Sequence, residues 1–303
     1  MSTLPNFVEE KIAAIQQRLD SSREEILTEY NEIFNDPAVS KDTQFSSTES
    51  RQRYAIAVLW GRYISRPPVK KYDVIPCGFD SLRKTRTGKL MSALFVIVRD
   101  ENGDPVLQRI SLLGGSTIAT MYRNVNILSQ NGAYRYSNVK LGSFGKGDDF
   151  VADNRTKFNS PAKIDLSPEK FREMLNIPLL KIAELIENPS KKRSTGYLIN
   201  TDWRCVKGII TDEMRGARKD SDLEWGIYRI ADETTPAEPY VTSDGRTVSP
   251  ALTCWTPVEL MVYEPESECE FYGPSSVDKD GIPSMNVNLI IPVYAKEKEE
   301  KEN

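Results

Sequence analysis

The 303-residue sequence contains no histidine. Imidazole is the commonest general base near neutral pH, so its absence excludes Ser-His-Asp and Cys-His catalytic devices. The usual zinc sites are excluded as well, because the cysteines are scattered and form no CxxC pair. We interpret Cys77, Cys205, Cys254 and Cys269 as reduced, mostly buried thiols of a cytoplasmic protein, and we expect neither a metal nor another cofactor.

Nucleotide-binding loops and membrane spans are also missing. No GxxxxGK[ST] loop occurs, and no GxGxxG sequence leads from a strand into a helix. Gly142, Gly145 and Gly147 lie between two β-like runs, which is typical of a hairpin turn. No run of about eighteen apolar residues is present, and the N-terminus lacks the basic-then-apolar order of a secretory signal. We therefore expect a soluble protein that is not an enzyme.

Charge is unevenly distributed along the chain, although the formal net charge is only −4. Residues 70–165 contain 15 Lys and Arg against 9 Asp and Glu, a balance of +6. Residues 195–303 contain 11 against 21, a balance of −10. A polyanion would be attracted to the middle segment and repelled by the C-terminal one. The alternative is that two solvated surfaces differ by chance.

Helical periodicity dominates residues 1–69, which we expect to form a helical N-terminal module. Apolar residues recur at helical spacing between residues 7 and 33. The sequence Ser22-Arg-Glu-Glu25 has the S-x-x-E form of a capping box and predicts that a second helix begins there. Another helix is predicted over residues 50–64, and Pro67-Pro68 ends it.

After Lys71 the periodicity becomes that of strands. The pattern predicts strands over residues 72–79, 89–98 and 106–112, a short helix over 116–123, and strands over 134–141 and 148–153. Asn102-Gly103-Asp104 predicts a hairpin turn between the second and third strands. Three strands, a helix and two strands follow the order of a five-stranded OB barrel, so we predict a basic OB fold over residues 70–165.

The remaining chain repeats the strand pattern after a break. Residues 166–194 are interpreted as a helical linker, which opens with Pro168 at the first helical position. Residues 195–296 predict a second, acidic OB-like domain, and residues 297–303 alternate charge without apolar residues, as disordered tails do. The predicted fold class is mainly β, with a helical N-terminal arm and two five-stranded Greek-key OB barrels in tandem.

Three segments of the middle domain resemble a known family. They are residues 72–76 (YDVIP), residues 82–89 (LRKTRTGK) and residues 132–140 (GAYRYSNVK). These segments resemble the DNA-binding OB domains of archaeal replication protein A, and the helical arm and second OB-like domain are similar to that family in layout. Members often carry a C-terminal zinc finger, which this chain has no residues to form. The resemblance implies single-stranded DNA binding without catalysis.

OB barrels bind single strands across their second and third strands and the connecting loops, where cations follow phosphates and aromatic rings stack on bases. Predicted contacts on the first hairpin and the third strand are Arg83, Lys84, Arg86, Lys89 and Arg109. A charged side chain within the third strand must point away from the barrel interior, and the groove is one such outward face. The alternative for the hairpin is a solvated turn that happens to be basic.

Further predicted contacts are Tyr134, Tyr136, Lys140, Phe144, Lys146, Arg155, Lys157 and Phe158. Strand alternation places Tyr134 and Tyr136 on one face with Lys140. Val139 and Leu141 lie on the other face, which we interpret as the core. The two tyrosines are then exposed and form a stacking platform. The alternatives are that both tyrosines pack under the adjacent helix, and that residues 155–158 pack on the barrel as a linker.

The second domain carries three tryptophans but little positive charge. We interpret Trp203, Trp225 and Trp255 as core or protein-interface residues first, and as base-stacking residues second. Its first hairpin contributes a minor predicted DNA contact through Arg215, Arg218 and Lys219.

The leading hypothesis is a cytoplasmic, nucleoid-associated protein of replication, recombination and repair that coats single-stranded DNA with little sequence preference. The acidic C-terminal domain would contact partner proteins, such as other replication protein A subunits or replication and repair proteins. The alternative is an OB-fold protein-interaction or RNA-binding subunit of a larger complex.

Overall fold

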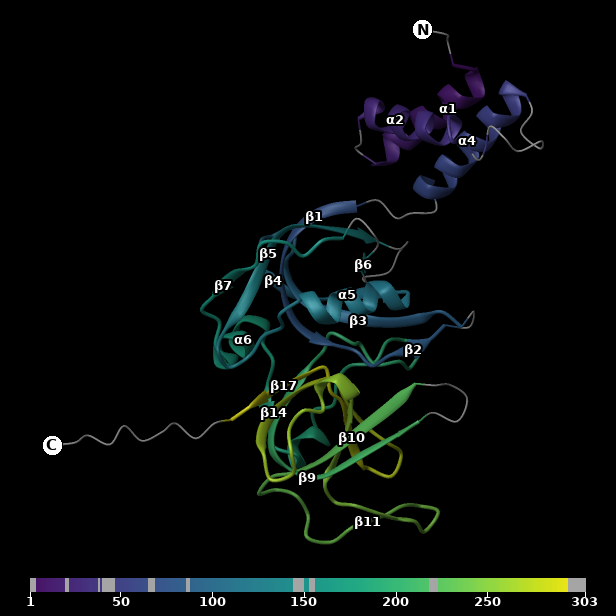
Figure 1. Cartoon of the computed structure of the whole chain (residues 1–303). Helices are drawn as coiled ribbons and strands as arrows, with labels where there is room; N and C mark the ends of the chain where they lie inside the picture. Colours follow the sequence, from purple (N-terminus) through teal and green to yellow (C-terminus); the bar gives the residue numbers. More distant parts are fainter. Residues whose placement is uncertain are drawn as a thin grey trace, which may run out of the picture. The chain divides into compact units, whose positions relative to one another are not determined.

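The computed structural model describes residues 4–19, 22–37, 39, 47–64, 69–85, 88–143, 150–152, 156–217 and 223–293. The chain divides into two compact units, one built mainly from Met1–Lys70 and the other from Lys71–Lys140 and Asp148–Asn303. The first is helical, and the second contains two large sheets and a small two-stranded one, with short helices beside them (Figure 1). Among the described helices, none has the length and apolar character needed to cross a membrane.

The helical unit contains α1 (Asn6–Leu19), α2 (Arg23–Phe34) and α4 (Thr48–Ile64). The capping box predicted before α2 is present, because the Ser22 hydroxyl accepts from the Glu25 amide at 3.2 Å and the Glu25 carboxylate accepts from the Ser22 amide at 3.2 Å. Buried apolar side chains from all three helices form one core, including Ile12, Ile26 and Leu59. The helices predicted here are confirmed.

The first sheet closes into a barrel. Its elements are β1 (Val69–Phe79), β2 (Arg83–Lys84), β3 (Leu90–Arg99), β4 (Pro105–Leu113), α5 (Gly115–Asn124), β5 (Ala133–Ser143), β6 (Phe150–Ala152) and β7 (Ala162–Ile164). Strand order runs β1-β3-β4-β6-β5, β5 also pairs with β1, and β4 pairs with β6 in parallel. The five barrel strands are β1, β3, β4, β5 and β6 in chain order. The third of them, β4, pairs with the fifth, β6, and the fourth, β5, pairs with the first, β1, which is the closed Greek-key order of an OB barrel.

The predicted hairpin between β3 and β4 is confirmed. The two strands pair antiparallel over their whole length, from Met91 opposite Leu113 to Arg99 opposite Pro105. Gly103 occupies the turn with a φ of +87°, a conformation that side chains with a Cβ rarely adopt.

The second sheet repeats the topology. Its strands are β8 (Leu179–Leu180), β9 (Arg204–Ala217), β10 (Glu224–Ala231), β13 (Leu252–Thr256), β14 (Glu268–Gly273), β15 (Ser275–Val277), β16 (Pro283–Asn286) and β17 (Leu289–Pro292). The other elements of this region are α6 (Pro168–Leu175), η2 (Ala183–Leu185), η3 (Val258–Leu260) and a separate two-stranded sheet of β11 (Tyr240–Val241) and β12 (Thr247–Val248). β13 pairs with β16 in parallel, and β17 pairs with β14, which pairs with β9. β16 and β17 therefore act as one interrupted fifth strand, and the prediction of two tandem OB barrels is confirmed.

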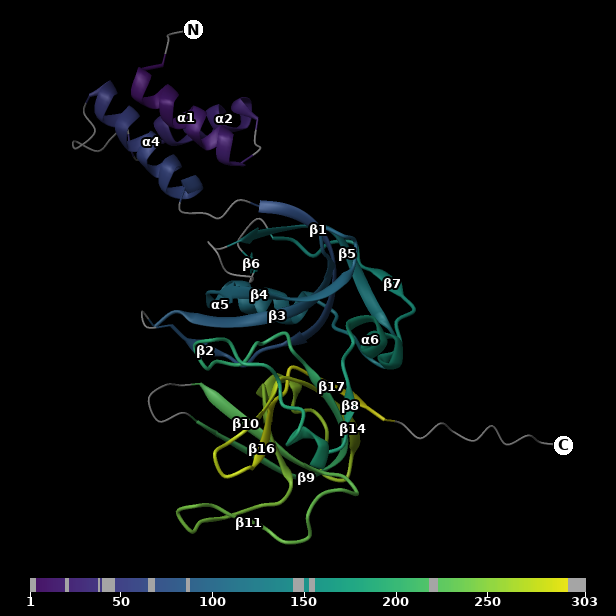
Figure 2. The ribbon, with the colours of Figure 1, turned by 180° about the vertical axis from the view of Figure 1, so that it is seen from behind.

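The two barrels share a hydrophobic core. Phe95 and Ile97 point from β3 out of the first barrel and join Trp203, Tyr272 and Leu289 from the second. The Phe95 and Trp203 rings meet edge to face, with centroids 5.1 Å apart. In Figure 2 the sheets are seen from behind, with β3 of the first facing β17 of the second. Both faces of β3 are consequently buried.

A reciprocal backbone contact adds to this junction. The Phe79 amide donates to the Asn288 carbonyl at 2.9 Å, and the Asn288 side-chain amide donates to the Phe79 carbonyl, also at 2.9 Å. Gly78 allows the close approach, because a Cβ there would lie 2.4 Å from the Asn288 carbonyl oxygen. The barrels are therefore joined as one body rather than tethered by a linker.

Candidate nucleic-acid interface

The predicted basic hairpin of the first barrel is exposed. Arg83 and Lys84 form β2, which pairs with the start of β3, and both side chains reach the surface, as does Lys89. Arg83 donates to the Asp80 carboxylate at 3.0 Å while its own side chain stays 52% exposed. Arg86 lies outside the described residues. The described cations of this hairpin are thus placed where a polyanion can reach them.

Arg109 is not on an open groove, which corrects the prediction for this residue. It points out of the barrel, as expected, but its side chain is only 8% exposed. The second barrel covers this face of the strand, where Phe95 lies directly opposite Arg109 in the sheet. The Arg109 guanidinium lies 3.5 Å from the Asp80 carboxylate and donates to the Ser111 hydroxyl at 3.1 Å. It is a structural partner at the barrel junction.

Tyr136 is fully buried, so its prediction as an exposed stacking ring is wrong. Its hydroxyl accepts from the Asn126 amide at 3.1 Å, and Phe158 packs against its ring edge to face. The reason is Asn138, whose φ of +57° breaks the alternation of β5. Tyr136 before the break and Val139 after it therefore both point inward.

The other predicted residues are spread over several surfaces. Tyr134 and Phe158 are half-buried, whereas Lys140 and Lys157 are exposed. Arg215 is exposed, forms an ion pair with Glu213 and donates to the Met261 carbonyl at 2.7 Å. The predicted contacts Phe144, Lys146, Arg155, Arg218 and Lys219 lie outside the described residues.

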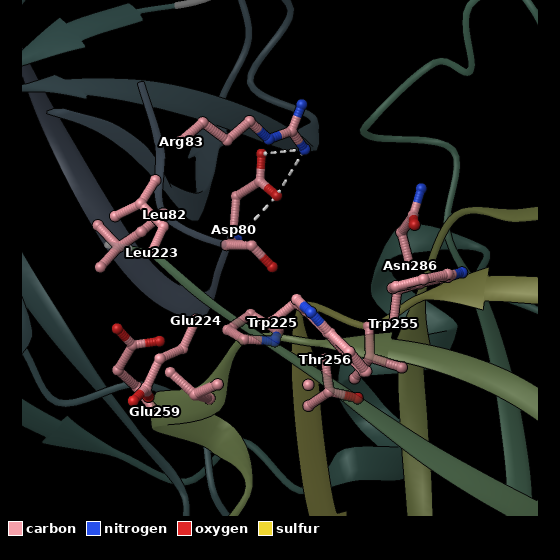
Figure 3. Close-up of a pocket in the computed structure, with 15 residues that line it drawn as sticks. Asp80, Leu82, Arg83, Leu223, Glu224, Trp225, Trp255, Thr256, Glu259 and Asn286 are labelled. Carbon is pink, nitrogen blue, oxygen red and sulfur yellow. Dashed lines mark hydrogen bonds and ion pairs between the residues drawn. The ribbon is translucent and has the colours of Figure 1, made fainter. Parts of the chain in front are cut away.

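A cleft of about 520 Å³ opens between the first hairpin of one barrel and the second and third strands of the other. Residues 80–83, 223–226, 255–259, 286 and 287 line it (Figure 3). This is the face of the second barrel on which OB folds bind single strands. The cleft thus joins a basic loop to an OB binding face.

Two tryptophans lie on that face. Along β10 and β13, Tyr228 and Cys254 point into the barrel, so alternation turns Trp225 and Trp255 outward. Trp255 is 46% exposed, and the two ring centroids are 6.3 Å apart at an interplanar angle of 60°. The interpretation of Trp203 as a core residue is confirmed, whereas Trp255 is not a core residue.

The backbone of β9 fixes the position of the Trp225 ring. A Cβ on Gly216 would lie 2.6 Å from ring atom Cζ2 of Trp225, so the ring lies directly against the glycine. The indole Nε1 donates to the Ala217 carbonyl at 3.3 Å. The ring is therefore held in place before any ligand binds.

A second cavity of about 570 Å³ adjoins the first, because Arg83 and Asn286 line both. Its remaining lining comes from residues 192–200 and Ser276. The loop turns at Gly196, whose amide donates to the Arg193 carbonyl at 2.8 Å, and it presents Tyr197 with 76% of its surface exposed. We call the two cavities together the inter-barrel trough, lined by Arg83, Lys192, Arg193, Tyr197, Glu224, Trp225, Trp255, Glu259 and Asn286.

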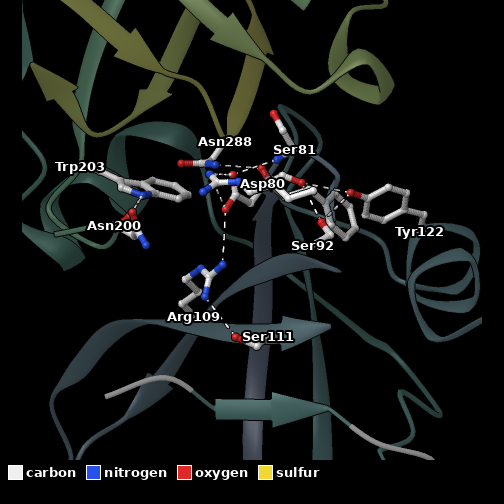
Figure 4. Close-up of polar contacts among 11 residues, drawn as sticks. Asp80, Ser81, Ser92, Arg109, Ser111, Tyr122, Asn200, Trp203 and Asn288 are labelled. Carbon is white, nitrogen blue, oxygen red and sulfur yellow. Dashed lines mark hydrogen bonds and ion pairs between the residues drawn. The ribbon is translucent and has the colours of Figure 1, made fainter. Parts of the chain in front are cut away.

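Asp80 anchors the hairpin that supplies Arg83 (Figure 4). Its carboxylate accepts from the Ser81 amide at 2.9 Å and from Arg83, and it faces Arg109. Its carbonyl accepts from the hydroxyls of Ser92 at 2.7 Å and Tyr122 at 3.1 Å. Burial raises the pKa of Tyr122 above its ordinary value, so this phenol remains a donor at neutral pH. The base of the basic hairpin is therefore rigid.

Sequence reasoning missed the second half of this site. Residues 191–193 (KKR) followed by Tyr197 combine cations with a ring, but the boundary predicted at residue 194 divides this stretch between the linker and the second domain. The sequence interpretation treats the tryptophan pair as core or protein-interface residues first, whereas strand alternation relative to Tyr228 and Cys254 turns both rings outward. No three acidic or thiol side chains gather into a metal site within the part of the chain that the structure describes.

Comparisons with known proteins find similarity among solved structures. No protein-family model and no curated protein matches the sequence. A replication protein A heterotrimer bound to single-stranded DNA aligns with 75% of this chain at 14% identity and a TM-score of 0.40. A murine DNA-binding protein bound to double-stranded DNA aligns with 77% of this chain and 98% of its own, at 8% identity and a TM-score of 0.31.

The wild-type single-stranded DNA-binding protein of Thermus aquaticus aligns with 76% of this chain and 96% of its own, at 11% identity and a TM-score of 0.20. This chain spans about half the length of the replication protein A chain, of which 49% is covered. The assignment of both sheets as OB barrels rests on their strand orders.

Proposed function

We propose that this protein binds single-stranded DNA in the inter-barrel trough and performs no chemistry on it. The observation that carries the proposal is the pair of the half-buried Trp225 and the exposed Trp255, which lines the same cleft as Arg83 on the OB binding face. A single strand lying there contacts both barrels at once.

The trough offers both kinds of contact that single strands require. Aromatic rings stack on bases and contribute roughly 1–3 kcal/mol for each stacked base. Trp255 is an exposed ring in one cavity and Tyr197 is an exposed ring in the other, and Arg83, Lys192 and Arg193 supply the cations. Every base has an aromatic face, so such a surface binds many sequences.

Local charge explains how a chain with a net charge of −4 can bind a polyanion. Charges are screened beyond a Debye length of about 8 Å at physiological salt, so a phosphate beside Arg83, Lys192 or Arg193 is attracted by that cation although carboxylates elsewhere make the net charge negative. Lys192 and Arg193 precede the acidic C-terminal region in sequence yet border the second barrel in space. The trough therefore combines a basic residue of the first barrel with two from the segment that follows this barrel in sequence.

We further propose a role in replication, recombination and repair like that of archaeal replication protein A, in the cytoplasm at the nucleoid. The acidic surface of the second domain would then contact partner proteins of that machinery. Support for this assignment comes from the resemblance of residues 72–76, 82–89 and 132–140, and from the tandem arrangement of the barrels.

Fluorescence anisotropy with a labelled 15-nucleotide oligo(dT) tests the proposal. We expect binding that weakens steeply with salt, and stronger binding than to a duplex of the same length, because paired bases cannot stack on the tryptophans. An RNA oligomer of the same length distinguishes DNA from RNA binding. Absence of binding to any single strand would contradict the proposal and favour a protein-interaction surface, where exposed tryptophans are also common.

A further inference from the structure

The end of the trough beside Trp225 differs in charge from the rest. Glu224 and Glu259 both line the cleft there, whereas the cavity on the other side of Asn286 is lined by cations. Carboxylates repel phosphates, so a strand seated in this cleft places a base, not its backbone, beside them. The charge pattern therefore orients the nucleotide that reaches Trp225.

The two carboxyl groups lie close together next to the stacking surface. Figure 3 shows Glu224 and Glu259 beside Trp225. Desolvation raises the pKa of Glu259, and the neighbouring Glu224 carboxylate raises it further, as expected for two acids that share one wall of a cleft. A base stacked on Trp225 would present its polar edge to this wall.

The polar side chains around the two tryptophans can distinguish bases by the hydrogen-bond donors that each base carries. An ionised carboxylate only accepts hydrogen bonds, so it pairs with the exocyclic amino group of cytosine or adenine. Thymine and uracil carry a carbonyl oxygen at the equivalent position, which a carboxylate repels. Asn286, next to Trp255 across the sheet, offers both a donor and an acceptor, the combination that adenine matches.

We propose that the tryptophan cleft selects a base with an exocyclic amino group where thymine and uracil carry the O4 carbonyl, that is cytosine or adenine, over thymine and uracil. This inference rests on the proposed function and adds a base preference to it. Glu224 and Glu259 act as the acceptors that read the amino group, and Trp225 and Trp255 provide the stacking faces on which the base lies.

The test uses three 15-nucleotide oligomers at neutral pH: oligo(dT), the same strand with every third thymine replaced by cytosine, and the same strand with those positions replaced by uracil. Cytosine and uracil have the same ring size and both lack the thymine methyl group, so the comparison isolates the hydrogen-bonding groups at C4 and N3. We expect the cytosine strand to bind about tenfold more tightly than the uracil strand.

The double substitution Glu224→Gln with Glu259→Gln identifies the acceptors. A glutamine amide can both donate and accept, so we expect the preference for cytosine to fall to within about twofold, with unchanged or improved binding of oligo(dT). Glu238→Gln is the control, because Glu238 is exposed outside the trough and its substitution leaves the preference intact.

Three results would overturn the inference. They are equal affinity of the wild-type protein for the cytosine and uracil strands, a preference for uracil, and a cytosine preference that survives in the double variant. Failure to bind any of the three strands is a different result, because it contradicts the proposed function itself.

Discussion

At the scale of single residues, Tyr136 and Trp255 show how much one backbone conformation changes the role of an aromatic ring. Both are strand residues that alternation alone assigns to a face. In β5 the positive φ of Asn138 shifts the alternation, and Tyr136 becomes a core residue. In β13 the alternation is unbroken between Leu252 and Thr256, and Trp255 stays outside.

If Trp255 stacks on a base, its removal should lower the affinity for single-stranded DNA. Substitution Trp255→Ala removes one stacking face, so the affinity for oligo(dT) falls by roughly 5- to 100-fold, while the slope of affinity against salt stays nearly constant because no phosphate contact is lost. Anisotropy titrations at several salt concentrations measure both. Val241→Ala is the control, since Val241 is an exposed apolar residue outside the trough. An unchanged affinity for Trp255→Ala would exclude this ring from the site.

For Tyr136 we expect the opposite result, a loss of stability without a loss of DNA affinity. Substitution Tyr136→Phe removes the hydroxyl that accepts from the Asn126 amide, and the loss of this part-buried hydrogen bond lowers the free energy of unfolding by about 0.5–1.5 kcal/mol. Affinity for oligo(dT) should not change. Urea unfolding measures the first quantity, and Tyr197→Phe serves as the control because that side chain is largely exposed. A Tyr136→Phe variant of normal stability but weak DNA binding would show that Tyr136 contacts the strand after all.

The break in alternation at Asn138 could not be predicted from the sequence. Asparagine adopts the left-handed conformation more readily than most residues, but it also occurs in regular strands, so its presence does not by itself locate a bulge. Arg109 is a second example. Its outward direction follows from the strand pattern, whereas its burial depends on a second barrel that docks on the same face.

At the scale of elements, the pairing of β9 with β10 positions the binding surface. Gly216 lies opposite Trp225 in this ladder, and the ring rests on the glycine because no Cβ intervenes. Replacing Gly216 by alanine puts a methyl group 2.6 Å from the ring and forces the indole to move.

We expect Gly216→Ala to weaken oligo(dT) binding on the order of fivefold, which is part of the stacking contribution of one base. The fold should persist, as judged by circular dichroism, because the displaced ring lies on the surface of the barrel. Gly61→Ala provides the matched control, since a Cβ there meets nothing within 4 Å. Equal affinities of the two variants would contradict a preformed position for Trp225.

The loop of residues 190–200 contributes positive charge beside the ring of Tyr197. Each phosphate contact on a single strand contributes about 0.7 to the slope of log affinity against log salt, so Lys192→Ala with Arg193→Ala should reduce that slope by about 1.4. Lys163→Ala with Lys170→Ala removes the same charge from exposed positions outside the trough and should leave the slope near the wild-type value. Identical slopes for the two double variants would place the phosphates elsewhere.

Element-level prediction succeeded where local patterns decide the outcome. The capping box at Ser22, the turn at Gly103 and the order of strands and helix along the first barrel all follow from short-range signals. The segment of residues 93–98 (ALFVIV) carried a further signal, because an apolar run without alternation is typical of a strand buried on both faces. That signal argues against an open groove on β3.

At the scale of the whole β unit, the shared core is what creates the site. Phe95, Trp203 and Tyr272 hold the two barrels together, and the trough forms where their surfaces meet. Residues 83, 193 and 255 are far apart in sequence and come together only through this docking. The sequence alone predicts both barrels but not how they pack, because docking depends on side-chain complementarity across many residues.

Hydrogen exchange with and without saturating oligo(dT) tests the central claim most directly, because it reports every segment that a bound strand covers. The trough predicts slower exchange in three separated segments: the hairpin around Arg83, the loop of residues 190–200, and the cleft segment of residues 255–259. These segments belong to both barrels, so protection must appear in all three together. Protection confined to the Tyr134–Lys140 side of the first barrel, or to one barrel alone, would contradict a single strand bound in the inter-barrel trough.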